Sequence, residues 1–298
     1  MNFDDTNLNE SETDDQFKKR SQWSDVWVRM RRNKLAMIGM CIVVILVLLS
    51  IFANIISPYD YTEQDMDRKL QFPSREHLLG TDNYGRDIFS RILHGGRTSL
   101  LVSLMSCSIS LGLSIIIGSC AGFFGRKVDM VIMRVVDILQ AMPAILMAVC
   151  VSAILGTGTW QTAVAVSAAG IAPGSRMIRA TILTIREREF VEAARAGGAG
   201  SFRIVFTHVL PNCLAPIIVD TTLRIGANIL SISGLSFIGL GVQPPIAEWG
   251  SMLNIGRRYI RSFWPMVTFP GVAIFLTMFG FNVFGDGLRD ALDPKLKR

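Results

Sequence analysis

Residues 189–211 read EFVEAARAGGAGSFRIVFTHVLP, and the interpretation of the flanking segments depends on this stretch. Its first part, from Glu192 to Ala194, contains good helix formers. Gly197 and Gly198 then interrupt the helix, because glycine readily adopts a left-handed turn. A second, amphipathic helix is expected to follow and to end at Pro211. One face of this second helix is expected to contain Phe202, Val205, Phe206 and Val209. The pattern predicts a helix-turn-helix with a crown of small residues.

Long apolar segments flank this stretch on both sides. Of the 298 residues, 50% are hydrophobic and 18% are charged, and the mean hydropathy is +0.40. Soluble domains carry about 25% charged residues, so a conventional soluble enzyme is disfavoured. The apolar residues are pooled into six runs of about 20 residues, the length that crosses a bilayer as a helix. These runs cover residues 35–56, 98–124, 131–155, 160–178, 214–240 and 265–284. The sequence therefore predicts an all-α integral membrane protein with six transmembrane helices.

The distribution of Lys and Arg predicts the orientation of these spans. With the N-terminus inside, 20 of the 30 Lys and Arg lie in inner segments, nine lie in outer segments, and Arg224 lies within the fifth span. Both termini and residues 189–211 are therefore expected in the cytoplasm. Residues 1–22 are polar and are expected to be a disordered tail. Residues 23–30 are expected to form a short helix in the membrane interface.

The spacing within residues 189–211 is specific. A glycine follows Glu192 by six residues, and Leu210-Pro211 follows that glycine by twelve and thirteen. This segment resembles the EAA loop of the membrane subunits of ABC importers, which docks as a coupling helix onto the cytoplasmic ATPase. One position departs from the family, since His208 stands where isoleucine is usual. The resemblance assigns ATPase docking to Glu192, Ala193, Ala194, Gly198, Phe202, Leu210 and Pro211.

Other motifs narrow the resemblance to the dipeptide/oligopeptide permease family, and to its second, or "C", type of membrane subunit. They are GTDNYGRDIFSR at residues 80–91, MRVVD at 133–137 with AMP at 141–143, LSFIGLG at 235–241 with QPPIAEWG at 243–250, and GDGLRDALDPK at 285–295. The resemblance runs from about residue 32 to residue 297. It implies the type I ABC importer permease (MetI-like) fold, and cargo among di- and oligopeptides, glutathione or nickel chelates.

The resemblance also implies a domain organisation and a set of partners. The expected organisation is an interfacial helix with the first span (23–57), an outer loop (58–97), a five-helix core (98–286) with a coupling loop (186–212), and a cytoplasmic tail (287–298). The expected partners are a second homologous permease subunit, two cytoplasmic ABC ATPases, an extracytoplasmic substrate-binding protein and the lipid bilayer of the cell membrane. The chain itself is expected to do no chemistry and to hold no cofactor, because ATP is bound by the partners.

The fifth span contains a polar stripe at helical spacing, formed by Asp220, Arg224, Asn228 and Ser231. Charged groups are costly at the bilayer centre and usually face the bundle interior or water. The stripe is therefore a candidate lining of the transport pathway. The alternative is an i,i+4 pair of Asp220 and Arg224 that snorkels to the inner surface. In the second span, Ser110, Ser114, Gly118 and Gly122 recur at every fourth position. This spacing favours close packing against another helix over the alternative, a role in passage of the cargo.

Other classes of function have less support in the residues. The five cysteines form no C-x-x-C pair and the three histidines are scattered, so no metal site is expected. No G-x-x-x-x-G-K-[ST] motif is present, and energy must come from a partner. The basic residues cluster at the ends of the apolar runs, which is typical of membrane topology rather than of nucleic-acid binding.

The outer stretch 247–261 is either an interfacial helix anchored by Trp249 and Trp264 or a docking surface for the external binding protein. An ion-driven carrier or channel subunit is the alternative function, although acidic relays at mid-membrane are nearly absent.

Overall fold

The computed structural model describes residues 22–292, and residues 1–21 and 293–298 lie outside the description. The expected disordered tail therefore falls almost entirely outside the described residues. Within residues 22–292 the regular structure is helical, and the one β-type pairing is an isolated bridge between Thr81 and Asp87. The α-helices are α1 (Gln22–Arg32), α2 (Lys34–Ile51), α3 (Ala53–Ile56), α4 (Ile88–Phe124), α5 (Arg126–Gln140), α6 (Ala144–Leu155), α7 (Thr159–Ile185), α8 (Glu189–Ala196), α9 (Ser201–Arg203), α10 (Leu214–Phe237), α11 (Trp249–Gly256) and α12 (Pro265–Leu292).

Four continuous helices are long and apolar enough to cross a membrane, and they cover Lys34–Ile51, Ile88–Phe124, Ser201–Phe237 and Pro265–Leu292. A bent pair, α5 with α6, makes a fifth if it is taken as one span. The remaining predicted span corresponds to α7, which has 27 residues but also contains Arg176 and Arg179. Both arginines bind carboxylates of α5, Arg176 with Asp137 and Arg179 with Asp129. The sixth span therefore stays a prediction that depends on α7.

The second predicted span begins ten residues earlier than the hydropathy indicated. Asp87 caps the helix at Ile88, because its carboxylate accepts a hydrogen bond of 2.7 Å from the backbone N–H of Ser90. The loop that precedes α4 consequently ends at residue 87, not at the predicted residue 97. Arg91 lies in the first turn of α4 and is buried. Its charge lowers the mean hydropathy of this segment, which is why the sequence did not predict a helix there.

The third predicted span is not one straight helix. α5 and α6 meet at an angle of 87° across Ala141, Met142 and Pro143. Proline removes a backbone donor and disfavours a helical conformation at the residue before it, which explains a break at this place. The chain thus turns sharply where a continuous span was expected.

The small residues of α4 pack directly on α7, as their spacing predicted. A Cβ atom on Gly118 would lie 2.7 Å from the carbonyl oxygen of Ser175 and 2.9 Å from Cβ of Ile178. On the facing helix, a Cβ atom on Gly174 would lie 2.4 Å from Oγ of Ser114. The two backbones can approach closely only because these positions carry no larger side chain.

Two successive residues, Glu248 and Trp249, fix the start of α11. The buried Glu248 carboxylate accepts hydrogen bonds from the N–H groups of Gly250 and Ser251 and from the hydroxyl of Ser99 in α4. Burial raises the pKa of Glu248, and these hydrogen bonds oppose that increase. Trp249 is 2% exposed and donates to the carbonyl oxygen of Ile92 at 3.0 Å. A residue this well buried is not available as an interfacial anchor, so the first turn of α11 belongs to the core.

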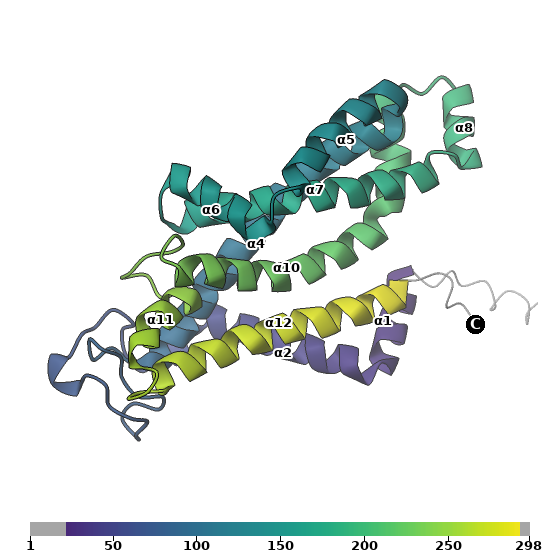
Figure 1. Ribbon diagram of the computed structural model, residues 1–298. Coiled ribbons are helices and arrows are strands. Elements are labelled where there is room, and N and C mark those ends of the chain that lie inside the picture. The colour runs from purple at the N-terminus through teal and green to yellow at the C-terminus, as the bar shows by residue number, and fades with distance from the viewer. Residues whose placement is uncertain (1–21, 293–298) are drawn as a thin grey trace, which may run out of the picture.

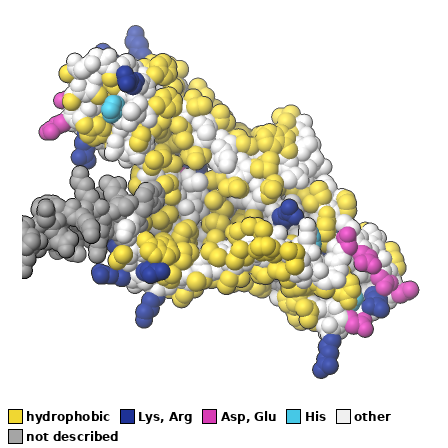
Figure 2. All heavy atoms as spheres, turned by 180° about the vertical axis from the view of Figure 1, so that it is seen from behind, with side chains coloured by type: hydrophobic (Ala, Val, Ile, Leu, Met, Phe, Trp, Pro, Cys, Tyr) yellow, Lys and Arg dark blue, Asp and Glu magenta, His cyan; other side chains and the backbone are white. Residues whose placement is uncertain are grey.

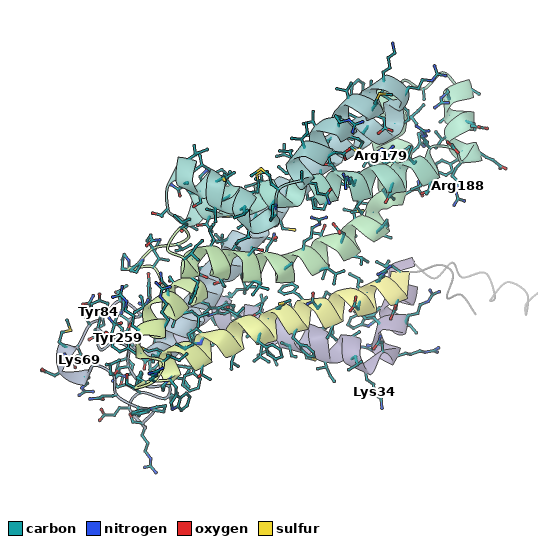
Figure 3. The ribbon with its side chains drawn as sticks, viewed as in Figure 1. Lys34, Lys69, Tyr84, Arg179, Arg188 and Tyr259 are labelled. Atoms are coloured by element: carbon teal, nitrogen blue, oxygen red, sulfur yellow. The ribbon has the colours of Figure 1, made fainter. Side chains whose placement is uncertain are left out.

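The described ends of the chain lie at the same end of the molecule as α8 (Figure 1). α11 and the loop between α3 and α4 lie at the opposite end. The labelled side chains follow this division, with Lys34 and Arg188 at one end and Lys69, Tyr84 and Tyr259 at the other (Figure 3). Figure 2 shows acidic and basic side chains gathered at the two ends and a mainly hydrophobic face between them. The architecture is that of a helical bundle with an apolar belt.

Candidate coupling site

The predicted helix-turn-helix is present, and its first helix is α8. This helix follows the end of α7 after a short turn and projects from the end of the molecule (Figure 1). Val191 anchors it, because its side chain is fully buried in a cluster that includes Ile178 and Ile182 of α7 and Ile204 of the following segment. α8 is therefore held on a packed hydrophobic base.

The turn after α8 is a Schellman motif. Gly198 has φ +81°, in the left-handed region. Its N–H donates to the carbonyl oxygen of Arg195 at 3.0 Å, and the N–H of Ala199 donates to that of Ala194 at 3.1 Å. Ala194 and Ala199 both pack against the hydrophobic base. The predicted glycine turn thus has a defined geometry, which sets where the second helix begins.

The surface of the turn is a crown of small residues. Ala193, Ala196, Gly197 and Gly198 are exposed, and nothing lies within 4 Å of a Cβ atom built on Gly198. Glu192 is exposed on the same helix, where its charge faces solvent. A partner surface can approach this backbone closely, and Glu192 offers it a carboxylate.

The second half of the motif differs from the prediction, because Pro211 does not end the helix. Short α9 leads into a π-helical segment, Ile204–Val209, and a 3₁₀ segment, Leu210–Cys213, which joins α10 directly. Residues 201–237 therefore form one continuous helical rod. The change in hydrogen-bonding pattern accommodates a proline that has no N–H to donate.

The π-helical segment also divides the predicted apolar face. Val205 and Val209 are buried, whereas Phe202 and Phe206 are 74% and 63% exposed. The extra residue per turn rotates the side chains away from the spacing of an α-helix. The two phenylalanines instead line an apolar hollow of about 140 Å³ with residues of α4, among them Ile116 and Phe124. Leu210 and His208 are half-buried and Pro211 is exposed.

The polar stripe of α10 faces other helices of this chain. Arg224 binds Asp220 one turn earlier and also donates to the carbonyl oxygen of Gly170 in α7 at 3.1 Å. Asn228 donates to Oγ of Ser106 in α4 at 3.4 Å. Ser231 donates to the carbonyl oxygen of Ala227 in its own helix. The predicted i,i+4 pair exists, but Arg224 ties α10 to α7 and is half-buried.

Asp220 also lines an open pocket of about 610 Å³ between α7, α10 and α12. Thr181, Asn212 and Arg289 contribute polar side chains to it, and Met177, Val219 and Leu223 contribute apolar ones. The pocket opens near the end of the molecule that carries α8. The structure thus places one residue of the stripe at a cavity with both charged and apolar walls.

Sequence reasoning missed the residues that support the candidate coupling site from α4 and the end of α7. Arg186, at the end of α7, donates to the carbonyl oxygen of Gly122 in α4 at 2.8 Å. Gly125, with φ +60°, ends α4 beside it. Gly125 directly follows the second apolar run, and a glycine at that place commonly marks the C-terminal end of a helix. No feature of the sequence, in contrast, indicates that Arg186 binds α4.

The chain matches known families over most of its length. Residues 114–298 match the model of the binding-protein-dependent transport system inner membrane component, and residues 21–73 match the N-terminal transmembrane domain of oligopeptide transport permease C. The dipeptide transport system permease protein of Alkalihalophilus pseudofirmus is 43% identical, over 95% of this chain and 93% of that protein. The glutathione transport system permease protein of Pectobacterium atrosepticum is 41% identical, over 93% of each.

The fold has a counterpart among solved structures. A chain of the MetNI methionine ABC transporter in an inward-facing conformation gives a TM-score of 0.56 at 17% identity, covering 68% of this chain and 96% of that one. The MetI-like fold is thereby confirmed, and an ion-driven carrier or channel finds no support in these matches. The family consists of membrane permeases, which are not enzymes and which work with ATPase and substrate-binding partners. The chain belongs to the binding-protein-dependent transport system inner membrane component family and is a permease subunit of an ABC importer.

Proposed function

We propose that this subunit forms half of a translocation pathway for short peptides, or for a peptide-like solute such as glutathione. The relatives at 43% and 41% identity are named for dipeptide and glutathione transport. The other half of the pathway is a second, homologous permease subunit. An extracytoplasmic binding protein delivers the cargo, and two cytoplasmic ATPases supply the energy.

The observation that carries this proposal is the exposed crown on a rigid base. α8 combines a buried anchor, Val191, with exposed small residues and an exposed carboxylate, Glu192. Such a surface suits a groove of a partner, because the buried side orients the helix and the bare side lets the partner approach closely. The ATPases dock here, with Glu192 facing a cationic group.

The route of the coupling signal follows from the chain itself. The crown continues through residues 201–213 into α10, which carries Asp220 and Arg224. A displacement of α8 therefore reaches the half-buried polar stripe through one helical rod. The stripe and the pocket of about 610 Å³ beside Asp220 form the inner part of the pathway.

The topology of the proposal places both termini in the cytoplasm. The described ends of α1 and α12 lie at the end of the molecule that carries α8 (Figure 1), so one cytoplasmic face would hold all three. The excess of Lys and Arg in the inner segments supports the same orientation. The loop of residues 57–87 then faces the binding protein.

Charge reversal at the crown tests the docking site. Glu192→Lys should leave the subunit in the membrane and abolish recovery of the ATPases when the transporter is purified through this chain. Gly198→Asp should act in the same way, because it puts a charged side chain on the bare surface that the partner must approach, where nothing lies within 4 Å of a built Cβ atom. Asp290→Lys is the matched control, since Asp290 is an exposed acid near the same end of the molecule. Full ATPase recovery and peptide uptake in both crown variants would contradict the proposal.

A further inference from the structure

The loop of residues 57–87 encloses a polar pocket that the coupling site does not use. Its volume is about 250 Å³, and its side chains come from Tyr59, Glu63, Asp65, Arg68, His77 and Asp87. Figure 2 shows acidic side chains gathered at the end of the molecule that carries this loop. In the proposed topology this end faces the extracytoplasmic side.

Carboxylates outnumber cations in the walls of the pocket. Arg68 is shared between Asp65, 3.3 Å from its Nε, and Glu76, 3.0 Å from its Nη1. Asp87 is met only by His77, whose Nδ1 lies 3.0 Å from Oδ1. Even with His77 protonated, the three wall carboxylates face two cations. The whole loop has the same sign, because residues 57–87 contain seven Asp and Glu against four Lys and Arg.

Two acceptors of the pocket have no partner. Glu63 is exposed, and its carboxylate forms no hydrogen bond or ion pair within residues 22–292. His77 is 4% exposed, and its Nε2 has no hydrogen-bond partner in the described part of the chain. Because Nδ1 needs its hydrogen to bind Asp87, the Nε2 of the neutral ring carries a lone pair. The pocket is therefore matched to a ligand that brings hydrogen-bond donors and positive charge.

The acidic walls are held in place before any ligand arrives. Oδ2 of Asp87 accepts from the N–H and the hydroxyl of Ser90, both at 2.7 Å. Asp65 caps the short 3₁₀ helix Met66–Arg68. Gly85, with φ +75°, lets two parts of the loop touch, since a Cβ atom built on it would lie 1.7 Å from the carbonyl oxygen of Asp65. Such preorganisation lowers the entropic cost of binding.

The size and geometry of the pocket favour a side chain of another protein. No group of three or more His, Cys, Asp or Glu in residues 22–292 is placed to hold a metal ion. The volume of about 250 Å³ also lies below the roughly 300 Å³ at which pockets for small molecules begin. One extended cationic side chain suits this space, and Tyr59 supplies an aromatic wall of the kind that such cations contact.

We propose that this pocket receives a lysine or arginine side chain of the extracytoplasmic binding protein, with Glu63 as its ion-pair partner. The inference rests on the proposed function, which supplies the binding protein as a partner. The negative charge of the loop speeds the encounter, and the pocket fixes where the binding protein docks.

Binding of the importer's own binding protein to the complete transporter in lipid nanodiscs tests the pocket. Glu63→Gln removes the free carboxylate at nearly constant size. It should weaken binding by about tenfold or more, because the partner's cation is left without its counter-charge. Asp67→Asn is the matched control, since Asp67 is an exposed acid of the same loop outside the pocket, and it should change the affinity by less than about twofold. Equal losses in both variants would mean that the loop acts only through its overall charge, and the proposal would be overturned.

A double-mutant cycle identifies the cation. Exposed lysines and arginines of the binding protein are replaced singly by alanine. One replacement should weaken binding as much as Glu63→Gln does, with little further loss when the two are combined. If no cationic residue couples to Glu63, the pocket receives no cation and the proposal is refuted. A binding protein that fails to bind even the wild-type transporter would instead contradict the proposed function on which the inference rests.

Discussion

Replacing Gly198 with alanine should weaken ATPase docking although the new methyl group has free space around it. Nothing lies within 4 Å of a Cβ atom built at this position, so a clash is not the reason. The reason is the backbone, because Gly198 has φ +81° and an L-residue pays about 1–2 kcal/mol in the left-handed region. A relaxed turn would lose the two Schellman hydrogen bonds and displace the start of α9.

The magnitude follows from that cost. If docking requires the native turn and the free loop can relax, 1–2 kcal/mol corresponds to an affinity about 5 to 30 times weaker. The assay is a titration of the detached ATPase subunits onto the permease pair in lipid nanodiscs. Gly198→Asn should fall between wild type and alanine, because asparagine tolerates the left-handed region better than other residues do.

The neighbouring glycine supplies the control. Gly197 has φ −74° and ψ 6°, which alanine adopts without strain, and its nearest contact to a built Cβ atom is an ordinary 3.4 Å. Gly197→Ala should therefore keep the wild-type affinity. Equal affinities for the two alanine variants would refute the reasoning that turn geometry, and not the mere smallness of the crown, controls docking.

Three further predictions concern the rest of the chain. Arg224→Leu should reduce peptide uptake in proteoliposomes more than assembly, because it removes both the pair with Asp220 and the bond to α7; unchanged uptake would count against a pathway role. A cysteine in place of Asp65 should react with an impermeant thiol reagent added outside, whereas one in place of Arg188 should not, and the opposite labelling would invert the topology. Gly118→Val should lower the melting temperature because it strikes α7, whereas Gly112→Val on the same helix meets nothing within 4 Å; similar melting of both would exclude close packing as the reason for the small residues.

Local signals in the sequence predicted the geometry of the glycine turn and of the close helix packing. The glycine turn, the exposed crown and the close packing of α4 each depend on residue size or on backbone freedom at a few positions. Gly198 in the left-handed region and Gly118 against Ser175 are cases in which one missing side chain defines the geometry. Such positions can be identified from spacing alone.

Features that depend on distant contacts were not predictable in the same way. The early start of α4 depends on Arg91 being buried beside Asp82, which a hydropathy window scores as a polar loop residue. The 87° bend of the third span has a signal in Pro143, but a proline can either kink a helix or end it. The π-helical segment has no sequence signal beyond Pro211, because the burial of Val205 and Val209 within it is a tertiary feature.

The rod of residues 201–237 has a mechanical consequence. Its 37 residues would extend about 55 Å as an α-helix, against a hydrocarbon thickness of about 30 Å. Unless strongly tilted, a rod of this length must protrude well beyond the lipid, and in the proposed topology its protruding end holds the crown of α8 away from the headgroups. A movement of an ATPase bound there would reach the membrane-spanning part through this continuous helix rather than through the membrane surface. Exchanging the lipids around such a transporter should consequently change the coupling of ATP hydrolysis to transport less than deleting one turn of residues 201–237 does.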